Sequence, residues 1–173
     1  MKTINELRDF GLKVGEVTSY IKYFKGMTID WDVYLPTIGK NLQRGFVWTI
    51  EQKRELIWSI LYGRHIPHMA FINTIDVLDN RKDVWLIIDG KQRLSTIFDF
   101  TDDKFTLIVD DKEYLFSELP KDYQTAINGL YFRYYLVNEE FNNRITDYDK
   151  ITWFKFINFS GTPQDIEHMK GLV

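Results

Sequence analysis

The sequence predicts a single α+β domain in which a mixed β-sheet is flanked by helices. The chain has 173 residues, a length that suits one domain. Hydrophobic residues make up 45% of the chain and aromatic residues 16%, which is enough for a packed core. Strand-like and helix-like patterns are interspersed, and no linker, repeat or low-complexity segment separates them. We therefore expect one domain over residues 1–173, with residues 1–30 as a weakly patterned N-terminal extension.

The composition excludes several classes of protein. The chain has no cysteine, so disulfides and zinc–thiolate sites are excluded. It has no run of about 18 apolar residues, and its first residues lack the apolar stretch of a signal peptide. We therefore expect a cytoplasmic protein with no membrane partner. Because the formal net charge is −3, any DNA contact would have to come from a local basic patch or from a partner subunit.

The N-terminal part of the chain carries two strand-like patterns. Residues 14–21 are compatible with a short strand or with the start of a helix. Residues 31–35 alternate apolar and polar side chains, which predicts a half-buried strand that ends at Pro36.

The first helix is predicted over residues 50–62. Thr49 is a favourable N-cap, and Gln52 lies three residues later in a capping-box pattern. Gly63 is expected to end the helix. The side chains predicted to face inward are Ile50, Ile57, Ile60 and Leu61.

Two strands are predicted after this helix. Pro67 precedes a strand over residues 69–72, and a turn over residues 79–82 leads to a second strand over residues 84–88. The second strand has almost no polar position, which is typical of a strand buried on both faces. We therefore expect residues 86–88 to lie centrally in the sheet.

The rest of the chain continues this mixture of helices and strands. In order, we expect a helix over 92–100, a β-hairpin of 105–109 and 114–116 around a turn at 110–112, a short helix over 120–127 with proline in its first turn, and a strand over 131–137. Thr146 and Asp149 form a capping pattern for a helix through Phe156, and Thr162 followed by Pro163 opens a final helix.

A polar segment follows the second of these strands. Asp89 and Gly90 end the strand, and Lys91, Gln92 and Arg93 stand at the start of the next helix. The unpaired N–H groups and the dipole at a helix start favour a bound anion, and a guanidinium group can hold phosphate oxygens in pairs. The pattern therefore indicates a phosphate-binding site.

Several residues of this segment allow two interpretations. Asp89 either holds a divalent cation or positions a nucleophile, or it closes an Asx turn. Gly90 permits a close backbone approach or a positive φ angle, as a plain turn glycine also would. Lys91 either reaches a phosphate or points to solvent. Ser95 and Thr96 either bind phosphate or metal, or they act as local caps.

A second Gln-Arg pair, Gln43 and Arg44, occurs upstream, just before the helix at residues 50–62. In both pairs the glutamine can orient a water or contact an oxygen beside the guanidinium group. Alternatively, each arginine pairs with a surface carboxylate. Because both pairs adjoin helix starts, we predict that the two pairs and Asp89 converge on one pocket.

Together these segments resemble the DUF262 family, the N-terminal domain of GmrSD-type restriction systems, which is related to the ParB/sulfiredoxin fold. The family pattern has a Gln-Arg pair, an aromatic residue, an Ile-Pro pair and a later Asp-Gly-Gln-Gln-Arg-Leu-Thr-Thr segment. The matching residues are Gln43 and Arg44, Trp48, Ile66 and Pro67, and residues 89–96, in which Lys91 replaces the usual Gln. Residues 154–163 resemble the family's Phe-x-x-x-Asn-x-x-Gly-Thr-Pro segment, which includes Asn158.

The resemblance implies a ParB/sulfiredoxin-like domain that binds and hydrolyses a nucleoside triphosphate on or near DNA, in a restriction, anti-restriction or DNA-modification setting. It implies Mg²⁺ as cofactor, and a separate effector protein for DNA cleavage. The catalytic residues would be Asp89, Gln92 and Arg93, with Asp89 also on the metal; the nucleotide-binding residues would be Gln43, Arg44, Gly90, Lys91, Ser95, Thr96 and Asn158.

Two other functions stay open. The chain has no Walker A sequence, so any nucleotide chemistry would use a scaffold other than the P-loop. Because the ParB/sulfiredoxin-like fold that the chain resembles also includes kinases, a second function is a phosphotransferase that passes the γ-phosphate to a hydroxyl group, as in a kinase of a hydroxymethylated base in DNA. Lys91 departs from the family pattern. It favours the other hypothesis, a catalytically silent module that binds a nucleotide or a partner protein.

Overall fold

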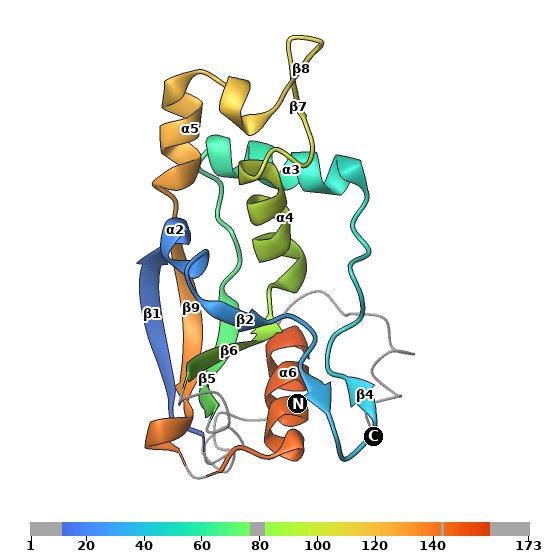
Figure 1. Ribbon diagram of the computed structural model, residues 1–173, viewed down its shortest axis with the longest axis vertical. Helices are drawn as coiled ribbons and strands as arrows, with labels where there is room; N and C mark the ends of the chain where they lie inside the picture. The colour runs from blue at the N-terminus through green and yellow to red at the C-terminus, as the bar shows by residue number, and fades with distance from the viewer. Residues whose placement is uncertain (1–11, 77–81, 143, 160–173) are drawn as a thin grey trace.

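The computed structural model describes residues 12–76, 82–142 and 144–159 (Figure 1). In these residues a five-stranded mixed sheet has the strand order β1-β9-β5-β6-β2. β1 pairs antiparallel with β9 and β5 with β6, whereas β9 pairs parallel with β5 and β6 with β2. The bounds are β1 (Val14–Tyr20), β2 (Thr28–Asp30), β5 (Met69–Asp76), β6 (Lys82–Asp89) and β9 (Tyr131–Asn138).

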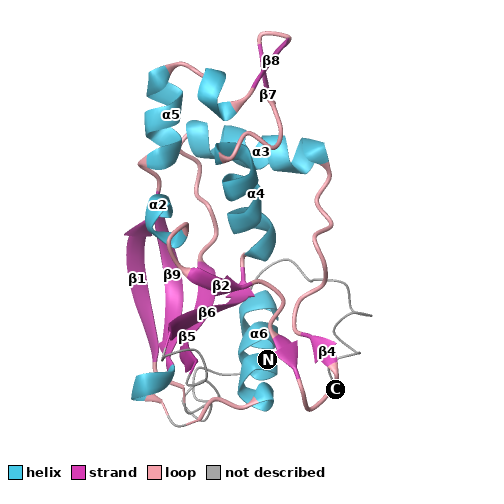
Figure 2. Cartoon of the chain, in the orientation of Figure 1, coloured by secondary structure: helices cyan, strands magenta, loops and turns pink. Residues whose placement is uncertain are grey.

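The remaining elements surround this sheet (Figure 2). The helices are α2 (Ile21–Phe24), α3 (Ile50–Leu61), α4 (Lys91–Thr101), α5 (Lys121–Asn128) and α6 (Asp147–Phe159). Two small sheets pair β3 (Tyr34–Leu35) with β4 (Lys40–Asn41), and β7 (Leu107–Val109) with β8 (Lys112–Tyr114). Short 3₁₀ helices span Phe116–Glu118 and Glu139–Phe141. The predicted α+β class is confirmed.

The sheet separates two hydrophobic cores. Phe71 and Ile87 pack on one face with residues of α2, α3, α4 and α5. Ile72 and Ile88 pack on the other face with residues of α6 and β3 and with Leu42, which follows β4. Ile87 and Ile88 are both fully buried, so β6 is covered on both faces as its apolar sequence predicts.

The position of β6 in the sheet agrees in part with the prediction for residues 86–88. β6 lies inside the sheet, between β5 and β2, but the middle strand is β5. The chain before residue 31 explains the difference, because it supplies both edges of the sheet as β1 and β2. Edge strands carry exposed residues, and the hydrophobic pattern of this part of the sequence is correspondingly weak.

Local capping signals are confirmed at two helices. The hydroxyl group of Thr49 accepts from the N–H of Gln52, and the Gln52 side chain accepts from the N–H of Thr49. Thr146 and Asp149 make the same reciprocal pair before α6. Gly63 adopts a φ of +65° directly after α3, where the C-terminal turn needs a left-handed residue.

The predicted strand over residues 31–35 is confirmed only at Tyr34 and Leu35, which form β3 and precede Pro36. The Asp30 carboxylate accepts hydrogen bonds from the N–H groups of Asp32 and Val33, and Val33 has a φ of +47°. This bend separates β2, which ends at Asp30, from the short β3, which begins at Tyr34. A local bond between an aspartate side chain and the backbone therefore overrides the alternating pattern.

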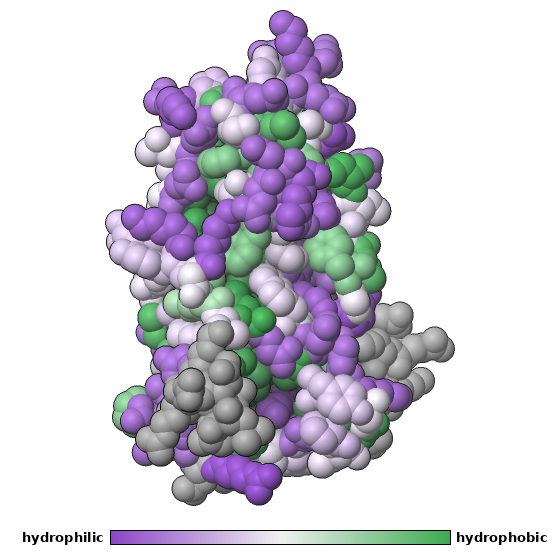
Figure 3. Space-filling view, viewed as in Figure 1, coloured by the Kyte–Doolittle hydropathy of each residue, from purple (hydrophilic) through white to green (hydrophobic). Residues whose placement is uncertain are grey.

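Smaller corrections concern element ends. Ile50 was expected to face inward but is 36% exposed, because the first turn of α3 extends past the core. Figure 3 shows hydrophobic side chains on the surface over the segment between β4 and α3, where Phe46 and Val47 are also exposed. The β7–β8 turn is only Asp110 and Asp111, both with positive φ, so the hairpin is shorter than predicted.

The remaining predictions concern the start of α5 and residues outside the described part of the chain. Pro120 is the N-cap of α5 and precedes its first turn. The predicted helix at Thr162 and Pro163, and residues 79–81 of the predicted turn, lie outside the described residues. Among the residues that the structure describes, no helix combines the length and hydrophobicity needed to cross a lipid bilayer.

Candidate functional site

A small cleft lies where β6 ends and α4 begins. Gly90 joins the two elements with a φ of +98°, a conformation that lets the chain turn sharply from the strand into the helix. The turn also brings the Gly90 backbone against the Met69 side chain, which leaves no room for a side chain at Gly90. The end of a buried strand and the start of a helix are thereby held in a fixed relation.

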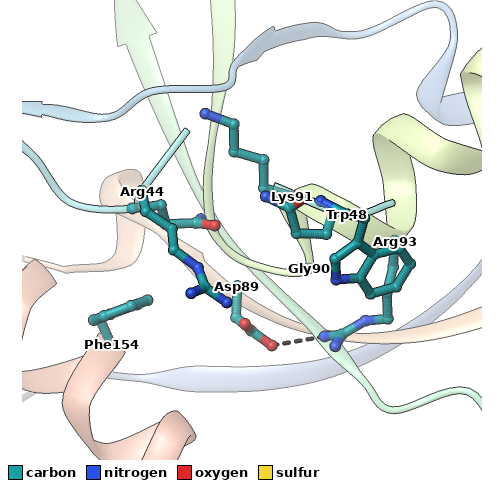
Figure 4. A pocket seen from close by; sticks show the side chains of 9 residues that line it. Arg44, Trp48, Asp89, Gly90, Lys91, Arg93 and Phe154 are labelled. Atoms are coloured by element: carbon teal, nitrogen blue, oxygen red, sulfur yellow. Dashed lines mark hydrogen bonds and ion pairs between the residues drawn. The ribbon is translucent and has the colours of Figure 1, made fainter. Parts of the chain in front are cut away.

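The cleft has a volume of about 100 Å³ and combines three distant parts of the chain (Figure 4). One part is the segment between β4 and α3, the second is the β6–α4 junction, and the third is α6. The lining residues are Gln43, Arg44, Trp48, Asp89, Gly90, Lys91, Gln92, Arg93 and Phe154. The two Gln-Arg pairs and Asp89 therefore share one cleft, as the sequence predicts, although their proposed functions stay predictions.

Arg93 and Asp89 form an ion pair across the first turn of α4. Nη2 of Arg93 lies 2.7 Å from Oδ2 of Asp89, and the two side chains are only 18% and 15% exposed. Nη2 also donates to the carbonyl of His68 at 3.2 Å, whereas the buried Nε atom has no hydrogen-bond partner. The guanidinium group is thus held in place with part of its bonding capacity unused.

Arg44 is the second cation of the cleft. It is exposed and forms no ion pair with any of the described residues. Figure 4 shows its guanidinium group directed toward Asp89, on the side of the carboxylate opposite Arg93. The cleft therefore holds two guanidinium groups and one carboxylate.

The N-terminus of α4 at the cleft has no side-chain cap. Its N-cap is Gly90, and no side chain of the residues that the structure describes caps the free N–H groups of the first turn. In contrast, Thr49 caps α3 and Thr146 caps α6. Unpaired N–H groups and the helix dipole add positive potential beside the two arginines. Electrostatically, the cleft suits an anionic group.

The two glutamines have different positions from those expected. The Gln92 side chain accepts from the N–H groups of Val47 and Trp48 and donates to the carbonyl of Gly45. The Gln43 amide donates to the carbonyl of Ile87 at 2.5 Å. In the structure both amides therefore fasten the segment before α3 to the β6–α4 junction, and their hydrogen bonds are made within the protein.

Gln43 and Arg44 precede α3 as predicted, but five residues separate Arg44 from its first residue. α3 begins at Ile50, and Thr49 already caps its start. Arg44 lines the cleft at the start of α4 because Gln92 holds the intervening segment in place.

Lys91 does not follow either interpretation of its sequence position. Its side chain is only 9% exposed, and Nζ lies 2.7 Å from Oδ1 of Asp32. Figure 4 shows the side chain extending away from Asp89 and Arg44. Lys91 thus contributes its backbone to the cleft, while its charge pairs with a carboxylate in the bend after β2.

Three further predicted contacts lie outside the cleft lining. Ser95 donates to the carbonyl of Lys91 at 2.6 Å, a bond within α4. Thr96 is fully buried, and its Oγ1 atom has no partner. Asn158 donates to the carbonyl of Phe154 at 2.8 Å, one turn earlier in α6. In each case helical periodicity directs the side chain to its own helix or to the core.

Two aromatic residues of the cleft were not among the predicted site residues. Trp48 belongs to the aromatic position of the first motif, and Phe154 opens the third motif. Both residues belong to the predicted family pattern, but an aromatic side chain in an apolar context normally indicates core packing instead of a binding site. Phe154 is in fact 1% exposed, so it forms the floor of the cleft as part of the α6 core.

The cleft offers few metal ligands. No group of three or more His, Asp or Glu side chains able to hold a metal occurs among the described residues. Asp89 is the acidic residue of the lining. A cation such as Mg²⁺ fits this donor set only when phosphate and water oxygens complete its coordination, as is usual for Mg²⁺ at nucleotide sites.

Comparison with known proteins gives one family match. The family model described as "GmrSD restriction endonuclease, N-terminal domain" matches residues 22–170. This range contains all three motifs and confirms the family expected from them. No curated protein and no solved structure matches the chain. The ParB/sulfiredoxin relation therefore stays a prediction.

Proposed function

The chain belongs to the GmrSD restriction endonuclease N-terminal domain family, and from this premise we propose that it binds a nucleoside triphosphate by its phosphates and hydrolyses it. The family places the chain in a restriction-system setting. Hydrolysis would occur on or near DNA and would control a separate effector protein that cuts it.

The observation that carries this proposal is the meeting of Arg44 and Arg93 at the uncapped start of α4. Two guanidinium groups and a helix dipole outweigh the single carboxylate of Asp89, so the cleft attracts an anion. A cleft of about 100 Å³ is smaller than the roughly 300–1,000 Å³ of whole-ligand pockets. We therefore assign it to the phosphate end of the nucleotide, with the sugar and base outside.

The ion pair supplies a physical basis for turnover. Asp89 would hold a Mg²⁺ ion that arrives with the nucleotide, and this charge sharing would free Arg93 to contact a phosphate oxygen. A water oxygen would attack the γ-phosphorus as the bond to the bridging β,γ-oxygen breaks, giving the nucleoside diphosphate, inorganic phosphate and a proton that passes to the solvent. Arg93 and Arg44 would stabilise the negative charge of the transferred group.

One observation favours a second candidate, a silent binding module. Asp89, Lys91 and Gln92 are all engaged within the protein, and none presents a free side chain to the cleft. If these contacts persist with a nucleotide bound, the site would hold phosphate without catalysing its transfer.

The test measures the fate of the γ-phosphate. Purified protein is incubated with Mg²⁺ and a panel of γ-labelled nucleoside triphosphates, with and without DNA that carries modified bases. Arg93→Ala should lower turnover by about 10²- to 10⁵-fold while weakening nucleotide binding much less. Arg93→Lys should rescue turnover poorly, because an ammonium group lacks the planar fork. Asp89→Asn should also abolish turnover.

Arg64→Ala is the matched control, since Arg64 is exposed and pairs with Glu55 away from the cleft. Free phosphate supports hydrolysis, whereas label on DNA would identify a phosphotransferase instead. Nucleotide binding without either product would support the silent module. Hydrolysis that is the same in Arg93→Ala, Asp89→Asn and wild type would refute the assignment of catalysis to this cleft.

A further inference from the structure

A strip of aromatic and cationic side chains crosses the outer strands of the sheet beside the cleft. We define it by Tyr20 of β1, Lys22 and Tyr23 of α2, Tyr131, Arg133 and Tyr135 of β9, and His68 before β5. The three β9 residues alternate along the strand and so point to the same face. Tyr20 pairs directly with Tyr131 in the register, which places it on that face too.

Ring contacts form the two ends of the strip, and a hydrogen bond connects one end to the cleft. The rings of Tyr20 and Tyr131 lie 3.9 Å apart between centroids, and those of His68 and Tyr135 lie 5.1 Å apart. The His68 carbonyl accepts a hydrogen bond from Arg93. One end of the strip is therefore in contact with the cleft, and the other reaches the β1 edge of the sheet.

The outer part of the strip is open to solvent. Tyr131 is 56% exposed, and the Arg133 side chain is 67% exposed. α6 packs against β6 on this face of the sheet. In Figure 1, β1 and β9 lie at the left of the sheet, and α6 lies to the right of them. Exposed tyrosine rings at this end have no role in either hydrophobic core.

Cations accompany the rings. Nζ of Lys22 lies 5.3 Å from the ring centroid of Tyr20 and 5.5 Å from that of Tyr23, which is itself 55% exposed. Nη1 of Arg133 lies 3.9 Å from Oε1 of Glu16, and both side chains are more than half exposed. This ion pair is therefore weak. Both cations are available to an anionic ligand on a chain whose net charge is −3.

We propose that this strip binds a single strand of DNA, with bases stacked on the tyrosine rings and phosphates on Lys22 and Arg133. Tyrosine faces interleaved with cations are the combination that binds unpaired nucleotides, because every base offers a face for stacking. From Tyr131 to Tyr135 the strand covers about 13 Å, enough for about four stacked nucleotides. A duplex would hide its base faces and would meet only two cations here.

The inference rests on the proposed function in one respect, namely that the strand is bound next to the nucleotide cleft. DNA binding by the strip can be measured in the absence of nucleotide. The result is therefore independent of whether the cleft hydrolyses a nucleoside triphosphate.

The experiment is fluorescence anisotropy with a labelled single strand of about 16 thymidines, and with a duplex of the same length. Tyr131→Ala and Tyr23→Ala should each weaken single-strand binding by about 5- to 150-fold, whereas Tyr131→Phe should retain it. Tyr148→Ala is the matched control, because Tyr148 is 74% exposed on α6. Circular dichroism confirms the folding of each variant, and Tyr23 on α2 provides a second position if Tyr131→Ala fails to fold.

Salt dependence separates the role of the cation from that of the rings. Arg133→Ala should reduce the slope of log K against log salt by about 0.7, whereas Tyr131→Ala should leave the slope unchanged. Arg64→Ala serves as the control for loss of one surface arginine. The proposal is overturned if wild type does not bind the single strand, if the duplex binds equally well, or if the strip variants bind like the controls.

Discussion

Gly90→Ala should destabilise the protein by several kcal/mol, since Gly90 is restricted by both its backbone and its surroundings. A residue with a side chain held at a φ of +98° costs about 1–3 kcal/mol in backbone strain. A Cβ atom at Gly90 would also lie 2.5 Å from Cγ and 3.0 Å from Cβ of Met69, which is fully buried. Overpacking of this kind adds about 1–3 kcal/mol, so the expected total is about 2–6 kcal/mol.

Gly45→Ala is the matched control in the segment before α3. Nothing lies within 4 Å of a Cβ atom built at Gly45, and its φ is not in the left-handed region. Its effect should stay within about 0.5 kcal/mol, as for most surface substitutions. Urea unfolding followed by tryptophan fluorescence measures both variants. With an m value of about 2 kcal/mol per M, the midpoint of Gly90→Ala should fall by roughly 1 M or more.

A double variant separates the two contributions. Adding Met69→Ala to Gly90→Ala removes the closest overlap, the one with Cγ of Met69, but leaves the tight contact with Cβ and the backbone strain. The free energies should therefore be non-additive by about 1–3 kcal/mol, with the double variant more stable than the sum of the single effects predicts. Equal midpoints for Gly90→Ala and Gly45→Ala, at unchanged m value, would show that the junction is not constrained as described.

Two further predictions concern buried polar groups. Thr96→Val should leave the free energy of unfolding unchanged or raise it by up to about 2 kcal/mol, because the buried Oγ1 atom has no partner; a loss in urea unfolding would reveal an unrecognised hydrogen bond. Burial raises the pKa of Asp147, but hydrogen bonds from Thr37 and Lys150 outweigh it and hold the pKa below the ordinary 3.8. The folded state thus favours the charged carboxylate. The stability difference between wild type and Asp147→Asn should be complete above about pH 4 and should disappear as the pH falls through the lowered pKa; a difference that grows in acid would contradict this.

The sequence alone was sufficient for features that depend on neighbouring residues. Thr49 with Gln52 and Thr146 with Asp149 form caps because the two partners are three positions apart, wherever the helix packs. The apolar run of β6 indicates burial on both faces for the same reason. The proposed phosphate site could be predicted from the sequence because Gly90 and Arg93 adjoin the start of a helix.

Only the tertiary structure decided which partners the long side chains take. Lys91 pairs with Asp32, which is 59 positions away, and Gln92 holds the backbone near Gly45, 47 positions away. Phe154 reaches the cleft only because α6 packs against β6. A flexible side chain has several possible partners of similar energy, and packing of distant segments determines which of them comes within reach. Local patterns therefore predict where a helix begins, whereas the composition of the cleft follows from how the sheet and its helices assemble.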